Sequence, residues 1–148
     1  MKNHIRKKRF LQIARFTNFL IPILYLSGCA HLGFVAYYDS TTYKNLTDLK
    51  PEISMFYETF AGDSVDVDKL AKIRLRLAQM YEYEKGKGPK NSETTRQIQI
   101  IQEMFERHVN DRLNMGKWTP AHLNNQKQNI GEAFDIAIQT ERLKNKNE

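Results

Sequence analysis

Apolar residues recur every three or four positions along most of this chain, which is the spacing of one face of an α-helix. No stretch of any length alternates apolar and polar residues, as a half-buried strand does. The spacing predicts helices over residues 41–60, 66–85, 92–116 and 119–143. Their apolar stripes are Leu46, Leu49, Ile53, Phe56 and Phe60; Leu70, Ile73, Leu77, Met80 and Tyr81; Ile98, Ile101, Phe105, Val109 and Leu113; and Leu123, Ile130, Phe134, Ala137 and Ile138.

The first predicted helix has a capping residue at its start and a proline in its interior. One of Asp39, Ser40 and Thr41 could cap it, because each side chain can accept a hydrogen bond from a free N–H of the first turn. Pro51 lies inside the pattern and lacks the N–H of an ordinary helical residue. We therefore expect the helix either to kink at Pro51 or to consist of two pieces.

Short connections join the four segments. The sequence Gly-Lys-Gly-Pro-Lys at residues 86–90 breaks the helical pattern. Thr119 followed by Pro120 favours a helix start, and residues 144–148 form a polar tail. Helices of about 20 residues joined by loops of about 5–8 residues should pack as antiparallel neighbours. The sequence therefore predicts an all-α fold, a small up-down four-helix bundle.

The first 29 residues follow the pattern of an export signal. A basic stretch extends to Arg9, an apolar run follows from Phe19 to Leu26, and small residues precede Cys29. The apolar run, of about 8–11 residues, is shorter than the roughly 20 that a helix needs to cross a bilayer. Pro22 also interrupts it. This order of charged, apolar and small residues is that of a secretory signal.

Leu26, Ser27, Gly28 and Cys29 resemble the lipobox of bacterial lipoproteins, in which an apolar residue and two small residues precede a cysteine. The resemblance implies that the Cys29 sulfur receives a diacylglyceryl group and that a signal peptidase cleaves between Gly28 and Cys29. It also implies that the new terminus is acylated by a fatty acid such as palmitate. Ala30 follows the cysteine, and the resemblance then implies the outer membrane, with the domain facing the periplasm.

An uncleaved membrane anchor is the alternative for this segment. Residues 19–38 are long enough to span a bilayer and follow basic residues, as the positive-inside rule requires. Pro22, His31 and two glycines in that stretch oppose a stable span. Under the lipoprotein interpretation the chain divides into a signal peptide over residues 1–28, a lipidated tether over residues 29–40 and a helical bundle domain over residues 41–148.

The positive charge of the chain belongs to the signal. The whole chain has 23 basic and 17 acidic residues, a net charge of +6. Six of the basic residues and none of the acidic ones lie in residues 1–28, which leaves 17 of each sign beyond them. A nucleic-acid-binding surface needs a clustered excess of positive charge. We therefore do not expect a nucleic acid as a partner.

The residue types that bind metals are too few and too widely spaced. The single cysteine excludes a disulfide within the chain and every multi-cysteine metal or heme site. The histidines are His4, His31, His108 and His122, and no two have the i, i+4 spacing of a helix-borne site. Glu106 lies two residues before His108, whereas di-iron bundles use Glu-x-x-His. We expect no metal, no cofactor and no enzymatic activity.

Other polar and aromatic features have structural explanations. Residues 86–92 are interpreted as a flexible turn rather than a phosphate loop, because the P-loop spacing is absent. We expect the carboxylates of Glu82, Glu84 and Asp135 to lie on solvated helix faces. Exposed aromatic side chains can contact a lipid interface or a protein partner. For Tyr43 and Trp118 we favour half-buried positions that cover the ends of the bundle, whereas Tyr37 and Tyr38 precede the first helix.

These observations favour a non-enzymatic envelope lipoprotein that binds or scaffolds another envelope protein. The location in the cell envelope follows from the N-terminal signal, and the binding role follows mainly from the lack of a recognisable catalytic pattern. An inhibitor or exclusion factor that blocks an invading element at the envelope is one alternative. A carrier of a small ligand between the helices is another, which we consider less favoured.

Overall fold

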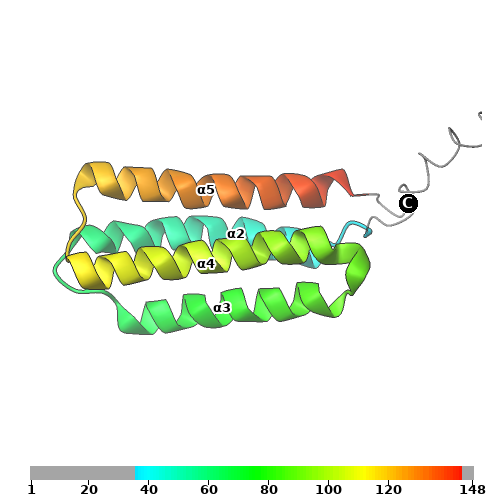
Figure 1. The fold of residues 1–148 in the computed structure, drawn as a ribbon, viewed down its shortest axis with the longest axis horizontal. Helices are drawn as coiled ribbons and strands as arrows, with labels where there is room; N and C mark the ends of the chain where they lie inside the picture. The colour runs from blue at the N-terminus through cyan, green and yellow to red at the C-terminus, as the bar shows by residue number, and fades with distance from the viewer. Residues whose placement is uncertain (1–35, 145–148) are drawn as a thin grey trace, which may run out of the picture. The chain divides into compact units, whose positions relative to one another are not determined.

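The structure, a computed structural model, describes residues 36–144 and contains four α-helices with no strand in that range (Figure 1). The helices are α2 (Ser40–Glu58), α3 (Val67–Gly86), α4 (Ser92–Met115) and α5 (Pro120–Leu143). There are also two short 3₁₀ turns in this range. The turn η2 (Thr59–Ala61) follows α2, and the turn η3 (Pro89–Asn91) precedes α4. The predicted all-α four-helix fold is confirmed.

Consecutive helices pack side by side, and the last one closes the ring. α2 contacts α3, α3 contacts α4, α4 contacts α5, and α5 returns to pack on α2 (Figure 1). Short loops between consecutive helices make this an up-down bundle. We call the end at which residues 36–39 enter the bundle the entry end; η3 and the last turn of α5 also lie there. The far end holds η2 and the loop between α4 and α5.

Side-chain caps start three of the helices, and the sequence predicted those of α2 and α5. The carboxylate of Asp39 accepts a hydrogen bond of 2.7 Å from the N–H of Thr41 at the start of α2. The carboxylate of Asp66 caps α3 in the same way, at 2.9 Å from the N–H of Lys69. The hydroxyl of Thr119 caps α5, which begins at Pro120. Each cap satisfies an N–H that has no partner inside its helix.

The core is built from the predicted stripes, with one error at the end of α4. Nearly every stripe residue is buried, but Leu113 is 58% exposed. Arg112 faces inward instead, and its guanidinium donates a 2.8 Å hydrogen bond to the carbonyl of Gly62. The buried face of α4 therefore continues from Val109 to Arg112, three residues later, and not to Leu113, four residues later. Tyr57 and Trp118 are buried members of the core that the stripes did not include.

Pro51 does not divide the first helix. α2 is one continuous helix over 19 residues, and Pro51 lies inside it with an exposed side chain. Of the two alternatives left open by the sequence, the division into two pieces is therefore excluded. The missing N–H of proline removes only one hydrogen bond from the ladder. The buried side chains of Leu49 and Ile53 on either side of Pro51 keep both halves on the same core.

Candidate functional site

The residues assigned to lipidation and cleavage lie outside the described part of the chain. Cys29 and Gly28 precede residue 36, as do His4 and His31. The remaining candidates fall at the two ends of the bundle. A buried polar cluster occupies the entry end, and a group of aromatic side chains closes the far end.

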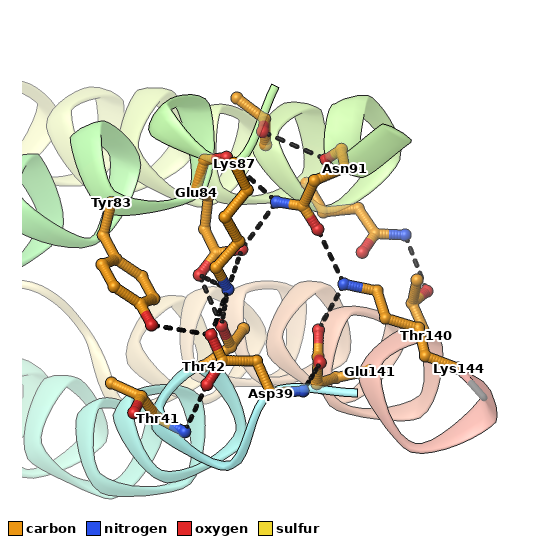
Figure 2. A network of polar contacts seen from close by, with 12 residues as sticks. Asp39, Thr41, Thr42, Tyr83, Glu84, Lys87, Asn91, Thr140, Glu141 and Lys144 are labelled. Carbon is orange, nitrogen blue, oxygen red and sulfur yellow. Dashed lines mark hydrogen bonds and ion pairs between the residues drawn. The ribbon is translucent and has the colours of Figure 1, made fainter. Parts of the chain in front are cut away.

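Figure 2 shows the polar cluster, in which side chains from three helices and from η3 meet. We call it the entry-end cluster. It contains three carboxylates, two ammonium groups and three neutral polar side chains: Asp39, Thr42, Tyr83, Glu84, Lys87, Asn91, Glu141 and Lys144.

Glu84 lies at the centre of the entry-end cluster and is fully buried. Its carboxylate accepts hydrogen bonds from the hydroxyl of Thr42 at 2.6 Å and from the side-chain amide of Asn91 at 2.8 Å. The ammonium of Lys87 lies 3.0 Å from the same carboxylate. The expectation that Glu84 lies on a solvated face is wrong, although Glu82 and Asp135 are exposed as expected.

A second buried carboxylate, Glu141, connects the end of α5 to the start of the described chain. It accepts a 2.7 Å hydrogen bond from the backbone N–H of Asp39 and a 2.6 Å bond from the ammonium of Lys144. Lys144 also donates to the side-chain oxygen of Asn91 at 2.8 Å. Lys144 is only 7% exposed, so the predicted polar tail begins one residue later.

Asp39 connects the contacts of Glu84 to those of Glu141, because its carboxylate pairs with Lys87 and its backbone N–H donates to Glu141. Its carboxylate lies 2.7 Å from the ammonium of Lys87 and accepts a 2.7 Å hydrogen bond from the hydroxyl of Tyr83. Burial alone would raise the pKa of Asp39, but the bonds from Lys87, Tyr83 and the Thr41 N–H outweigh it and hold that pKa well below its usual range. Burial alone would lower the pKa of Lys87. The hydrogen bonds and negative charges of Asp39 and Glu84 outweigh burial and raise that pKa.

Hydrogen bonds among its own members hold the entry-end cluster together. Each carboxylate accepts hydrogen bonds from at least two donors within it. These bonds fix the first residues of the bundle to α3, η3 and α5. The arrangement therefore holds the entering chain in one position.

The helical spacing itself contained the signal for this cluster. Glu84 lies four residues after Met80, and Glu141 lies four residues after Ala137, so both continue the buried stripes of their helices. Each is followed three residues later by a lysine, Lys87 or Lys144. The available signal was therefore the position of each glutamate on an apolar stripe, which faces the core.

The far end holds the one histidine with a clear structural role. His108 is 6% exposed, and its Nδ1 lies 2.9 Å from the hydroxyl of Tyr57. The pKa of His108 is lowered to about 4, mainly by burial and also by the charges of Arg107 and His122, whereas the charge of Asp111 opposes them. Burial raises the pKa of Tyr57, so that its hydroxyl stays protonated and shares this hydrogen bond with the neutral imidazole.

Trp118 closes the core at the far end. It is 5% exposed, its ring packs edge-on against Phe60 at 4.8 Å between centroids, and its backbone N–H donates to the Phe60 carbonyl at 2.9 Å. His122 packs against the outer side of Trp118. Tyr43 is partly buried at the entry end, where its ring lies 6.1 Å from that of Tyr38. Both residues lie at an end of the bundle as expected, but only Tyr43 is half-buried, because Trp118 belongs to the core.

Two grooves on the surface lie beside the entry end. One, of about 230 Å³, lies between α2 and α3 and is lined by residues that include Leu49, Arg76 and Tyr83. The other, of about 800 Å³, is open and lies between residues 36–40 and the end of α3. We call it the entry-end groove; its side chains include Tyr37, Tyr38, Glu82, Tyr83, Lys87 and Lys90.

The comparisons add no relative. No family model, curated protein or solved structure matches the chain. Within residues 36–144, no helix is long and apolar enough to cross a bilayer. Over the same residues, no three histidine, cysteine or acidic side chains are placed to hold a metal ion together.

Proposed function

We propose that this chain is a lipid-anchored envelope lipoprotein whose helical bundle works without catalysis, by binding or scaffolding another envelope protein. Cys29 is the proposed acylated residue, with cleavage between Gly28 and Cys29. The periplasmic face of the outer membrane is the proposed location. The bundle begins at Ser40, only a short distance along the chain from the proposed anchor. One end of the bundle is thereby held, and the other is left for contact.

The observation that carries the binding role is the exposure of large apolar side chains at the far end. Val67 is 71% exposed, Leu113 is 58% exposed and Met115 is 75% exposed. They do not serve the core, because Phe60 and Trp118 already close it there. Large apolar side chains that remain exposed to solvent can serve as contacts for another protein. Methionine adapts well to a partner's surface.

The buried carboxylates support a role without catalysis. The carboxylates of Glu84 and Glu141 are committed to hydrogen bonds inside the protein. The imidazole of His108 is hydrogen-bonded to the hydroxyl of Tyr57 and lies in the core. These groups therefore order the bundle, and contact through its surface is the remaining use of the fold.

Metabolic labelling tests the anchor. Cells that express the full chain are grown with an alkyne fatty acid, and the wild type is compared with Cys29→Ser. We expect label on the wild type and none on the variant, because Cys29 is the only cysteine of the chain. Equal labelling of both proteins would show that the lipoprotein assignment is wrong. Density fractionation of the labelled membranes then tests the outer-membrane location.

Site-specific photo-crosslinking tests the contact surface. A photoreactive residue is placed at Met115, and a matched one at Asn125, an exposed polar position of α5. We expect a discrete adduct with one envelope protein from Met115 and none from Asn125. Leu113→Glu should abolish the adduct, because it puts a charge into an apolar contact. An adduct that survives Leu113→Glu contradicts the proposal, and an adduct with a protein of an invading element favours the exclusion factor.

A further inference from the structure

Tyrosine and lysine side chains line the entry-end groove, together with two acidic side chains, Asp39 and Glu82. Tyr37 and Tyr83 line it and are 60% and 42% exposed. Lys90 stands beside them and forms no ion pair within residues 36–144. Tyrosine presents an apolar ring and a polar hydroxyl, which is the combination favoured at the boundary between a bilayer and water. A lysine ammonium beside such rings can pair with a lipid phosphate.

The entry-end cluster fixes the walls of this groove. The hydroxyl of Tyr83 donates to Asp39 at 2.7 Å, and the ammonium of Lys87 lies 4.4 Å from the centre of the Tyr83 ring. Figure 2 shows Tyr83 and Lys87 converging on Asp39 from α3. The backbone of Asp39 is in turn held by Glu141. The groove is therefore formed before any contact is made, which lowers the entropy cost of docking.

The chain that precedes the groove indicates what covers it. Residues 30–38 contain no Asp, Glu, Lys or Arg, and they include Leu32, Phe34 and Val35. From Cys29 to Asp39 this segment can extend at most about 35 Å. The helices are of similar length, since 24 residues span about 36 Å. An anchor at Cys29 therefore keeps the entry end near the bilayer, through a segment without a charge to oppose contact.

From these observations we infer that the entry-end groove is a membrane-docking surface that rests on phospholipid headgroups. Tyr37 and Tyr83 lie at the level of the headgroups, and Lys90 pairs with their phosphates. The bundle then stands with its entry end on the bilayer, and its far end points away. The inference rests on the proposed lipid anchor, and it explains why the apolar far-end surface is free for a partner.

Fluorescence quenching of the acylated full chain in vesicles tests the orientation. A bimane probe is attached through Glu82→Cys in the groove or, as a matched site, through Asp63→Cys at the far end. Both native side chains are well exposed, at 67% and 89%. With a nitroxide on the lipid headgroups, we expect the probe at residue 82 to be quenched at least about three-fold more than the probe at residue 63, because a bundle length separates them. Equal quenching at both sites overturns the inference.

Variants identify the side chains that make the contact. In the Glu82→Cys background, Tyr37→Ser and Lys90→Glu should each lower the quenching. Lys72→Glu is the matched change, at an exposed lysine near the start of α3, and it should not lower the quenching. The effect of Lys90→Glu should grow when phosphatidylglycerol is mixed into phosphatidylcholine vesicles. If Lys72→Glu acts as strongly as Lys90→Glu, general charge rather than the groove is responsible, and the inference is wrong. A protein or glycan that protects the probe at residue 82 without lipid also overturns it.

One control separates this inference from the proposed function. Acylation consumes the Cys29 thiol, so the membrane-extracted wild type should not react with the bimane reagent. A wild type that reacts shows that the anchor proposal has failed, whatever the probes report. An unreactive wild type with equal quenching at residues 63 and 82 shows instead that the anchor is present and the docking is not.

Discussion

The side-chain amide of Asn91 donates a 2.8 Å hydrogen bond to the carboxylate of Glu84, and its oxygen accepts a 2.8 Å bond from Lys144. Asn91 thus joins two buried ion pairs, Glu84–Lys87 and Glu141–Lys144, that belong to different helices. A buried ion pair need not add net stability, because desolvation opposes the attraction between its charges. The hydrogen bonds of Asn91 do specify that the ends of α3 and α5 meet at η3.

Removing one member of this arrangement should be costly. Glu84→Ala leaves the ammonium of Lys87 short of a partner and leaves Thr42 and Asn91 without their acceptor. We expect the free energy of unfolding to fall by about 3–5 kcal/mol, as for other broken buried pairs. Urea denaturation of Glu84→Ala beside Glu82→Ala measures it. The exposed Glu82 should matter by no more than about 0.5 kcal/mol, and similar losses for both variants would contradict a buried cluster.

The low pKa of Asp39 predicts an acid-dependent contribution to stability. A carboxyl group whose pKa is lower in the folded chain than in the unfolded one stabilises the fold above the unfolded pKa, near 4. This contribution is lost as the pH falls below that value. Asp39→Asn keeps the helix cap but not the charge that pairs with Lys87. We expect Asp39→Asn to be less stable by about 1 kcal/mol at pH 7, a modest value because solvent screens the pair.

The pH dependence of that difference is the critical measurement. Urea denaturation of the wild type and Asp39→Asn at several pH values should give curves that approach each other as the pH falls below about 4. Asp63→Asn serves as the control, because the Asp63 side chain is 89% exposed. A constant gap between wild type and Asp39→Asn down to low pH would mean that the charge of Asp39 is not what stabilises the fold.

The sequence predicted the helices and the core better than it predicted the polar contacts. Apolar spacing locates a helix face regardless of what the face meets, so stripes such as Leu46 to Phe60 could be read directly. Glu84 could not be placed by residue type, because most glutamates lie in solvent. Its burial depends on Lys87 and Asn91, which are near in sequence, but also on Thr42, which only the fold brings close.

The far end shows the same limit. Trp118 could be expected at the end of the bundle from its place in a loop, but the hydrogen bond between His108 and Tyr57 joins residues on different helices. No local spacing encodes that pair. The error at Leu113 has a similar cause, since Arg112 turns inward to reach the carbonyl of Gly62, which is distant in the sequence. Polar contacts across the bundle therefore set the details that apolar periodicity leaves open.

His108 predicts a second pH dependence, at higher pH than that of Asp39. Its pKa is about 4 in the folded chain, against 6.5 for an ordinary histidine. As the pH falls from 6.5 towards 4, the unfolded chain takes up a proton that the folded chain does not, so the free energy of unfolding decreases. The loss should reach up to about 3 kcal/mol, since each pKa unit corresponds to about 1.4 kcal/mol.

A variant that cannot titrate isolates this effect. His108→Gln keeps an acceptor for the hydroxyl of Tyr57, and its stability should change less between pH 6.5 and 4. His122→Gln, at the partly exposed histidine nearby, should retain most of the wild-type slope. Denaturation curves at several pH values measure all three proteins. An unchanged slope in His108→Gln would assign the acid sensitivity to other groups.

Leu75 and Leu77 on α3 test the division between core and surface within a single turn. Leu77 is fully buried, whereas Leu75 is 59% exposed and lies on the outer face. Leu77→Ala should lower the free energy of unfolding by about 2–5 kcal/mol, because it leaves a cavity that the bundle can only partly fill. Leu75→Ala should change it by no more than about 0.5 kcal/mol. Urea denaturation of the two variants decides whether α3 has the orientation described, since a helix rotated about its axis would exchange or equalise the two effects.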